Sequence, residues 1–332
     1  IRHLKKIGIN IFSKHQEKNI KNIDVLVVSA AISAKNPEVK SAINQKIPII
    51  TRAEMLAEIM RFRFGIAISG THGKTTTTSL IVQIMTEAKL DPTYIIGGII
   101  NATGMNAKLG KSDYLIAEAD ESDASFLHLQ PMLSVITNID EDHMSTYSHN
   151  YDNLTDAFIK FTSNLPFYGI CVACIDDKGV KDILKKIHRP VLSYGCSENA
   201  DVKASNIQQN ELRMTFDVNC SKYDKKFPVI LNLIGNHNIL NALAAISVAI
   251  ELEIKIEDIQ KALLNFSGVS RRLDFHQYLS INVYKVPLFD DYGHHPNEIS
   301  AVVSTLRNTY PDKRLLVIFQ PHRYSRTRDL FN

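Results

Sequence analysis

The chain has 332 residues, a length that accommodates two or three domains of ordinary size. Hydrophobic residues make up 45% of it and charged residues 22%, which is typical of a soluble globular protein. The formal net charge of +3 gives no reason to expect nucleic acid as a partner, and no apolar run approaches the length of a membrane span. Because no signal peptide is visible and four cysteines make no disulfide framework, we expect a reduced, cytoplasmic protein.

Strand and helix signals alternate over the first 63 residues. An apolar run at 22–32 ends in a turn of small residues, and a short strand is expected at 47–51 between helical patterns at 36–46 and 52–62. This alternation predicts part of a parallel α/β unit whose opening strand lies before residue 1. The chain also ends on an incipient helix, so we expect a piece of a longer protein.

The most informative stretch is 64–80, where an apolar run reaches a glycine turn, a lysine and a helical segment. Backbone N–H groups of the turn at 70–73 can point at oxyanions, Lys74 can place a charge on the outer phosphates, and the Thr75 hydroxyl can ligate Mg²⁺. The pattern G-x-x-G-K-T is two residues tighter than the usual phosphate loop, which has glycine where Ile68 stands. The alternative is a strand–turn–helix corner with an incidental lysine. The flanking strand and helix favour a nucleotide site.

The central part of the chain continues this alternation of strands and helices. We expect helices at 153–165 and 235–252. Short strands with charged turns at 200–234 predict a β-rich appendage. Apolar strands are expected at 113–119, 133–138 and 170–175. Parallel strands with helical crossovers place ligand sites at the carboxyl ends of the strands.

Cys171 and Cys174 form a C-x-x-C pattern inside the strand expected at 170–175. A zinc site would need a second cysteine pair, and Cys196 and Cys220 stand alone in the sequence. Positions three apart on a strand also face opposite sides. We therefore expect reduced thiols in the core.

Polar residues follow the central strands. Glu118 belongs to an acidic cluster at the exit of one strand and suits a Mg²⁺ site, although a solvated acidic turn is the alternative. Asn138 and His143 follow the next strand and offer an amide and an imidazole. Asn238 and Asn241 share one face of a helix, where their amides can read the edge of a purine.

A third region starts near residue 268. A strand runs into the polar loop at 290–296, and a helix is expected at 297–310 after Pro296. A further strand is expected within 314–326, where it runs into a basic loop. Arg323 and Arg326 in that loop are spaced to clamp a carboxylate, although a solvated basic end is the simpler interpretation.

Together these stretches resemble the ATP-dependent Mur ligases of peptidoglycan synthesis. The resemblance runs in the family's order along the whole chain, and its motifs are collectively very specific. The segments that carry it are 69–78, 118–131, 138–143, 235–242, 268–275, 290–298 and 319–330.

The resemblance implies an α/β protein of three domains, of which the first and last are partial and Rossmann-like. Residues 1–63 would bind the UDP-sugar, and residues 64–268 would form a central P-loop-type ATP-binding domain. Residues 269–332 would bring the amino acid.

The implied reaction joins L-alanine to the lactyl carboxylate of UDP-N-acetylmuramate through an acyl phosphate, with ATP and Mg²⁺, in peptidoglycan precursor synthesis. Residues 118–131 and 321–327 favour this branch over a sister branch that attaches a ready-made peptide to the same sugar. A truncated remnant that binds ATP without catalysis is another alternative, and the tight loop argues against an unrelated P-loop kinase. We expect a monomer or a weak homodimer, with no nucleic acid partner and no membrane insertion.

The resemblance also implies roles for individual residues. Lys74, Glu118 and His143 would be catalytic, with Thr75 and Glu118 on one Mg²⁺ and His143 on a second. Asn238 and Asn241 would face adenine, Arg272 the phosphates and Asp291 the ribose. The remaining ATP contacts would be Gly70, Thr71, His72, Gly73 and Thr76. The substrate contacts would be Ser29, Ala30 and Arg52 for the UDP-sugar, Asn138, and His294, His322, Arg323 and Arg326 for alanine.

Overall fold

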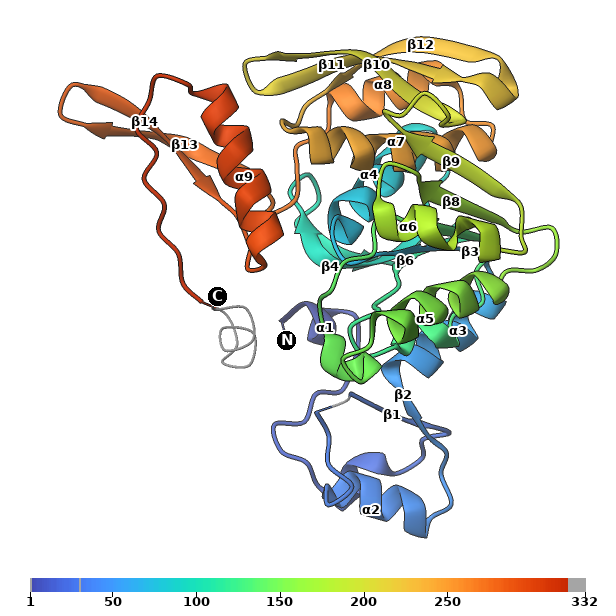
Figure 1. The fold of residues 1–332 in the computed structure, drawn as a ribbon. Helices are drawn as coiled ribbons and strands as arrows, with labels where there is room; N and C mark the ends of the chain where they lie inside the picture. Colours follow the sequence, from blue (N-terminus) through green and yellow to red (C-terminus); the bar gives the residue numbers. More distant parts are fainter. Residues whose placement is uncertain (1, 30, 322–332) are drawn as a thin grey trace. The chain divides into compact units, whose positions relative to one another are not determined.

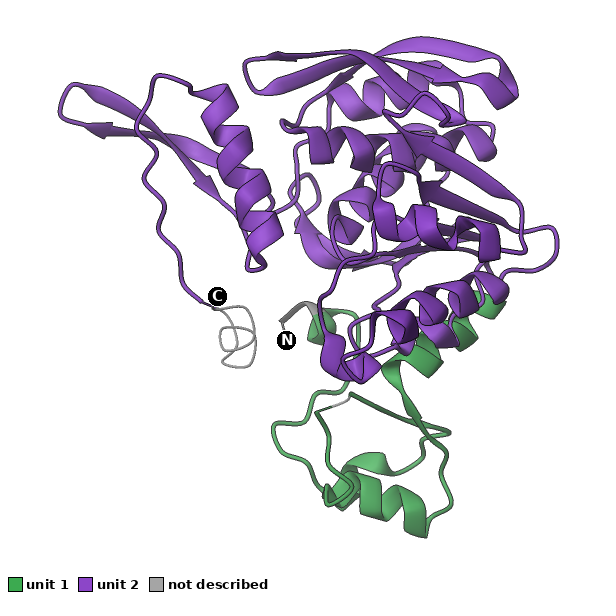
Figure 2. Ribbon diagram, in the orientation of Figure 1, with its two compact units in different colours: residues 1–62 green, residues 63–332 purple. Residues whose placement is uncertain are grey.

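The computed structural model describes residues 2–29 and 31–321. Ala30, His322, Arg323 and Arg326 of the expected site therefore lie outside the described residues. The chain divides into two compact units, Ile1–Phe62 and Arg63–Asn332 (Figure 2). Within the described residues, no helix is both long and apolar enough to span a membrane.

The first unit contains the parallel strand pair that the sequence predicts. β1 (Leu26–Val28) pairs in parallel with β2 (Ile49–Thr51), and Val28 lies opposite Thr51. The Thr51 hydroxyl accepts a hydrogen bond from the Glu54 N–H, and the Glu54 carboxylate accepts one from the Thr51 N–H. This capping box begins the helix after β2. The other elements of the unit are α1 (Arg2–Lys6), η1 (Glu17–Ile20), α2 (Pro37–Asn44) and α3 (Arg52–Arg61).

The second unit is built on a ten-stranded sheet with the order β12-β11-β10-β9-β8-β7-β3-β6-β4-β5 among the described residues (Figure 1). The strands from β10 to β4 in this order run parallel to their neighbours, and β5 joins β4 antiparallel. The strands are β3 (Phe64–Ser69), β4 (Thr93–Ile100), β5 (Met105–Lys108), β6 (Tyr114–Glu118), β7 (Leu133–Ile136), β8 (Ile170–Cys174), β9 (Val191–Gly195), β10 (Val202–Asn210), β11 (Arg213–Cys220) and β12 (Lys225–Leu231).

The expected β-rich appendage consists of strands, but it is not a separate part. Val202 and Lys203 of β10 pair in parallel with Tyr194 and Gly195 of β9, and the antiparallel strands β11 and β12 follow. The backbone groups of β9 need a partner strand on the side away from β8, and β10 supplies it. The region therefore extends the central sheet.

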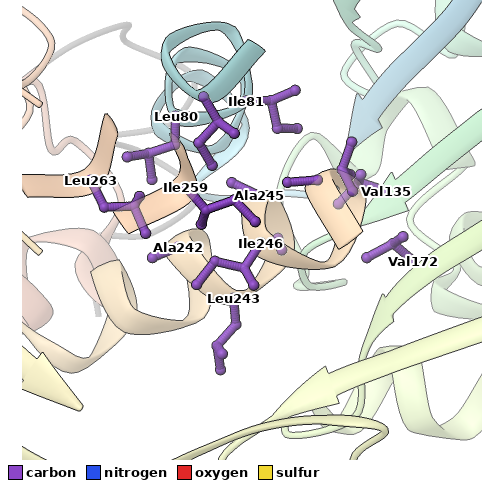
Figure 3. Close-up of a cluster of buried hydrophobic side chains, with 14 of the residues drawn as sticks. Leu80, Ile81, Val135, Val172, Ala242, Leu243, Ala245, Ile246, Ile259 and Leu263 are labelled. Atoms are coloured by element: carbon purple, nitrogen blue, oxygen red, sulfur yellow. The ribbon is translucent and has the colours of Figure 1, made fainter. Parts of the chain in front are cut away.

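Helices cover the sheet on both faces (Figure 1). α4 (Lys74–Glu87), α7 (Asn236–Glu251) and α8 (Ile256–Leu264) pack together on one face. Their apolar side chains form a buried cluster with residues of the strands, such as Val135 of β7 and Val172 of β8 (Figure 3). The remaining segments are α5 (Tyr151–Ser163), α6 (Lys178–Ile183), η2 (Ser125–His128), η3 (Met144–Tyr147), η4 (Leu184–Lys186) and η5 (Ser221–Tyr223).

Cys171 and Cys174 lie on β8, and both are buried free thiols, as predicted. Burial raises the pKa of each thiol to about 11, so both stay protonated at neutral pH. Cys174 belongs to the cluster with α4 and α7, and Cys171 does not, in keeping with their opposite orientations on the strand.

The last part of the described chain is a hairpin followed by a helix. β13 (Asp274–Ile281) pairs antiparallel with β14 (Tyr284–Asp290), and the predicted helix is α9 (Pro296–Thr309), which begins at Pro296, one residue before the expected start. The strand expected within 314–326 is wrong for its described part, because 314–321 forms none. Leu316 and Ile318 are 80% and 93% exposed, so this apolar run has no neighbouring strand to pair with among the described residues.

The buried cluster offers a matched pair of side chains for a stability test. Leu263 is fully buried in it, and its neighbour Leu264 on α8 is 37% exposed (Figure 3). We expect Leu263→Ala to lower the free energy of unfolding by about 2–5 kcal/mol, because it removes buried methyl groups and leaves a cavity. Leu264→Ala should cost less than about 1 kcal/mol. Urea unfolding followed by circular dichroism compares the two, and equal losses would contradict this description of the core.

Candidate functional site

The turn between β3 and α4 packs closely against two other loops. Gly70 has φ +133° and Gly73 has φ +80°, and a Cβ on either would collide, with the Thr137 hydroxyl and the Asn241 amide respectively. Glycine is therefore required at both positions for backbone and steric reasons. The loop is shaped by its neighbours as much as by its own sequence.

The N–H groups of the turn are not all directed at a ligand. Thr71 N donates to the backbone oxygen of Asn138 at 3.1 Å, and His72 N donates to the Asn138 side-chain oxygen at 2.7 Å. The expectation that the whole turn at 70–73 points its N–H groups at an anion is thus wrong for these two. The first turn of α4 still presents N–H groups that have no intrahelical acceptor, as every helix start does.

Lys74 lies in a network of acceptors. Its Nζ donates to Gly70 O at 2.6 Å and Thr71 O at 3.2 Å, and it lies 2.9 and 2.8 Å from the two carboxylate oxygens of Glu121. Glu121 is 3% exposed. The lysine is therefore held by a buried carboxylate as well as by its own loop.

Thr75 and Glu118 lie together, as the sequence predicts for a shared metal. The Thr75 hydroxyl donates to a carboxylate oxygen of Glu118 at 3.3 Å, and Gly97 N donates to the other at 2.7 Å. Burial raises the pKa of Glu118, and the hydrogen bond from Gly97 and the charge of Lys74 offset only part of that effect. The Thr75 hydroxyl and the Glu118 carboxylate together form an oxygen donor set that suits Mg²⁺, because nearby groups balance the negative charge of the carboxylate only in part.

A cavity of about 320 Å³ opens beside this loop. Several predicted ATP contacts line it together with residues to which sequence analysis gave no role. The predicted ATP contacts among its lining residues are His72, Gly73, Thr76, Asn238, Asn241, Arg272 and Asp291, and the predicted substrate contact Asn138 also lines it. Gly70, Thr71, Lys74, Thr75, Glu118, His143 and His294 are not among its lining residues. The volume is in the range of small-molecule sites.

The two asparagines on α7 are buried and fix each other. Asn238 Nδ2 donates to Ile234 O at 2.8 Å, Asn241 Nδ2 donates to Asn238 Oδ1 at 3.1 Å, and the Thr77 hydroxyl donates to Asn241 Oδ1 at 3.2 Å. Each amide keeps one N–H beyond these bonds, so both can still serve a ligand. Burial lowers the pKa of their neighbour His237, which also lines the cavity, to about 4, so its ring is neutral.

Asp291 and Arg272 also line this cavity. The Asp291 carboxylate accepts hydrogen bonds from Leu273 N and Gly293 N, both at 2.6 Å. Burial raises its pKa. The Arg272 guanidinium lies 3.6 Å from the Glu298 carboxylate and 5.7 Å from the centre of the Tyr292 ring.

His72 links the phosphate loop to the start of α9. Its Nε2 is 3.3 Å from Asp140, its Nδ1 is 3.4 Å from Glu298, and its ring centre lies 5.2 Å from that of His295. Asn297 Nδ2 also donates to Asp140. Potential ligand atoms of His72, Asp140 and His295 lie within 4.8 Å of one another, which differs from the predicted metal set of Thr75, Glu118 and His143.

His143 follows β7 on a loop tied to the acidic loop after β6. Its Nε2 lies 3.3 Å from Asp142. The Tyr147 hydroxyl donates to Glu121 O at 2.5 Å, and the Thr146 hydroxyl donates to Ser122 O at 2.6 Å. These bonds join the loop of His143 to the loop that supplies Glu121.

The remaining described candidates lie elsewhere. Ser29 and Arg52 follow β1 and β2 in the first unit, at the carboxyl ends of neighbouring parallel strands. His294 Nδ1 is 2.9 Å from Tyr292 O and 3.7 Å from Glu298.

Sequence analysis gave Glu298 no role, and it included Glu121 only as a member of the acidic cluster around Glu118. Glu121 stands three residues after Glu118, and nothing in the sequence says which carboxylate of that cluster meets the lysine. Glu298 was detectable as an acid in the first turn of a helix, and its side chain accepts hydrogen bonds from His294 N and His295 N.

The link through His72 predicts a pH dependence. Burial lowers the pKa of His72, but the hydrogen bonds and charges of Glu298 and Asp140 raise it to a net value above normal. A raised pKa means that His72 stabilises the fold most below its unfolded value and loses this effect as the pH rises through the folded value. His295 has the opposite shift, from burial and the charge of His72, and Arg272 also faces Glu298.

We therefore expect His72→Asn to lower the thermal midpoint by on the order of 2–4 °C more at pH 5.5 than at pH 9. Differential scanning fluorimetry across this range measures the difference between variant and parent. His149→Asn, an exposed loop histidine, is the control and should give no pH-dependent difference. A pH-independent loss for His72→Asn would contradict the raised pKa.

Comparison with protein families gives three matches in succession. A model described as "Mur ligase family, catalytic domain" matches residues 1–64, one described as "Mur ligase middle domain" matches residues 68–249, and one described as "Mur ligase, glutamate ligase domain" matches residues 271–332.

Individual relatives agree with these matches. The chain is 64% identical over 329 residues to the UDP-N-acetylmuramate–L-alanine ligase of Vesicomyosocius okutanii and 66% identical over 329 residues to that of Ruthia magnifica, covering 99% of this chain and 70% of each relative. A crystal structure of the UDP-N-acetylmuramate-alanine ligase from Thermotoga maritima superposes with a TM-score of 0.81 at 26% identity, covering 99% of this chain and 74% of that one. The chain belongs to the Mur ligase family.

Proposed function

We propose that the protein ligates L-alanine to the lactyl carboxylate of UDP-N-acetylmuramate, with ATP as the energy source, in peptidoglycan precursor synthesis. The observation that carries the proposal is the cavity, where Asn238, Asn241, Arg272 and Asp291 converge beside Gly73 of the phosphate loop. The proposed substrates are those in the names of the relatives that are 64% and 66% identical to this chain.

The residues around the loop fit a nucleotide with Mg²⁺. The glycines leave no side chain between the loop and its neighbours, and the first turn of α4 offers N–H groups to phosphate oxygens. Thr75 and Glu118 would hold one ion, and His143 would hold a second near the substrate carboxylate. Bound Mg²⁺ supplies positive charge that offsets the repulsion between that carboxylate and the γ-phosphate.

The chemistry requires activation because a carboxylate has no good leaving group. Transfer of the γ-phosphoryl group to a carboxylate oxygen of the sugar acid breaks the bond to ADP and forms an acyl phosphate. The alanine amine then attacks the carbonyl carbon, a tetrahedral oxyanion forms and collapses, phosphate leaves, and the amine proton is released. Phosphoryl transfer of this kind depends mainly on positioning and on neutralising charge.

The chain's own residues supply the positioning and the charge neutralisation. Lys74 places its ammonium on the β- and γ-phosphates, and Arg272, which lines the cavity, also reaches the phosphates. Asn238 and Asn241 orient adenine with their remaining amide groups, and the neutral ring of His237 can stack on the base. The carboxylate of Asp291 accepts from a ribose hydroxyl.

The substrate sites are further parts of the proposal. We assign the UDP-sugar to Ser29, Ala30 and Arg52, with residues 1–63 as its domain, and Asn138 to the same substrate. Alanine is assigned to a domain of residues 269–332, with residues 64–268 as the ATPase domain. The alanine contacts are His294, His322, Arg323 and Arg326. A cytoplasmic location and a monomeric or weakly dimeric state complete the proposal.

The test is ADP release in the presence of Mg²⁺. We expect release that depends on both UDP-N-acetylmuramate and L-alanine, measured by a coupled pyruvate kinase assay and by mass spectrometry of the product. ATP binding without release would support a non-catalytic remnant. Release with a ready-made peptide in place of alanine would support the sister activity. Either result would overturn the proposal.

Lys74→Met tests the role of the lysine. It removes the ammonium but keeps most of the side chain's apolar volume, so the transferred phosphoryl group loses its charge partner. We expect kcat to fall by about 100-fold or more, as for the loss of other electrostatic contacts to a transition state. Steady-state kinetics measure this. Lys203 lies on β10 and forms an ion pair with Glu198. Lys203→Met is the control and should keep normal turnover. A near-normal kcat for Lys74→Met would refute the assigned role.

A further inference from the structure

Lys74 has no hydrogen-bond donor left for a phosphate in this structure. Its ammonium has three N–H groups, and four acceptors lie within 3.2 Å of Nζ: the two carboxylate oxygens of Glu121 and the backbone oxygens of Gly70 and Thr71. Lys74 is also not among the residues that line the cavity, although Gly73 and Thr76 are. A nucleotide therefore cannot gain this lysine unless an existing contact is given up.

Glu121 is the contact with which a phosphate competes most directly. Its two carboxylate oxygens are the charged acceptors among the four, and they neutralise the lysine that would otherwise attract an anion. The backbone oxygens of Gly70 and Thr71 belong to the loop itself and move with the lysine. An incoming phosphate thus replaces the ion pair between Lys74 and Glu121 with an ion pair between Lys74 and the phosphate.

Hydrogen bonds from η3 hold the backbone of Glu121 in place. The Tyr147 hydroxyl donates to Glu121 O, and the Thr146 hydroxyl donates to Ser122 O, so the loop after β6 is tied to η3. With 3% of its surface exposed, the Glu121 side chain has little room to follow the lysine. Burial raises the pKa of Glu121 while the charge and hydrogen bonds of Lys74 lower it, as expected for a desolvated acid with one counter-ion.

The neighbouring buried acid has different partners. Glu118 accepts hydrogen bonds from Gly97 N and from the Thr75 hydroxyl, and it is the carboxylate that is expected to bind the metal. Glu118 and Glu121 therefore have separate hydrogen-bond partners, although the charge of Lys74 acts on both.

We propose that Glu121 is a positioning residue that holds the Lys74 ammonium outside the nucleotide cavity and competes with the phosphates for it. This inference rests on the proposed use of ATP. Glu121 lowers the affinity for ATP and ADP, and it takes the lysine back when ADP leaves. No covalent bond changes, because the lysine only exchanges a carboxylate for phosphate oxygens.

Glu121→Gln tests the competition directly. The amide keeps the size of the side chain but removes its charge, so the lysine becomes available to phosphates. We expect the Kd for ADP and for ATP, measured by isothermal titration calorimetry, to fall by about tenfold. Asp123→Asn removes the same charge from an exposed position on the same loop and should leave both Kd values unchanged.

A double-mutant cycle separates this role from a merely structural one. In a Lys74→Met background, Glu121→Gln should leave nucleotide affinity unchanged, because the competition needs the ammonium. If Glu121→Gln fails to fold, Glu121→Asp replaces it. That variant draws the carboxylate back by one methylene and should also tighten nucleotide binding.

The outcomes distinguish this inference from the proposed function. Absence of ATP binding to the parent protein would defeat the proposed function itself. Normal binding to the parent with an unchanged or weaker affinity in folded Glu121→Gln would overturn the competition alone. Tighter binding that persists in the Lys74→Met background would overturn it as well, because the effect would then act through some other group.

Discussion

The parallel pairing of β7, β3 and β6 is the constraint on which the site depends. Ser69 lies opposite Ile136, and Ile68 lies opposite Glu118, so the loops after all three strands start at the same edge of the sheet. That register brings Gly70 against the Thr137 hydroxyl, where any side chain would collide. The chemistry of the loop is thus determined by strand pairing, and a slip by one residue would turn Glu118 to the other face.

Charge is distributed around this edge in buried or half-buried clusters. Lys74 pairs with Glu121 on the loop after β6, and His72 lies between Asp140 after β7 and Glu298 on α9. A buried charge is costly without a partner, so each cluster stabilises a geometry only while its members stay together. The same property makes such clusters responsive, because a polyanion that offers a better partner can replace one member. Stability without nucleotide and readiness to bind it are therefore two properties of the same contacts.

The sequence predicted the elements in which periodicity or motif spacing is strong. The helices from Pro37, Tyr151, Asn236 and Pro296 and the strands β3, β6, β7 and β8 were expected because their apolar residues repeat or run together at the right spacing, whereas β4, β5 and β9 of the same sheet were not. β13 was missed, since it is half exposed and polar. The pairing of Lys74 with Glu121 could not be predicted, because the acidic cluster offers several carboxylates and only the fold selects one. Asn238 and Asn241 were found because their spacing on one helix face needs no tertiary information.

The unusually tight phosphate loop also has a physical reason. Ile68, at the position where a longer loop carries glycine, is fully buried within β3 and belongs to the core cluster with α4 and α7. The strand therefore continues to Ser69, and only four residues remain for the turn before α4. A turn this short cannot satisfy its own N–H groups, and Asn138 accepts from both Thr71 and His72. Asn138 accordingly shapes the loop from the segment that follows β7, and a loss of its side-chain amide would remove the bond from His72 without changing the motif itself.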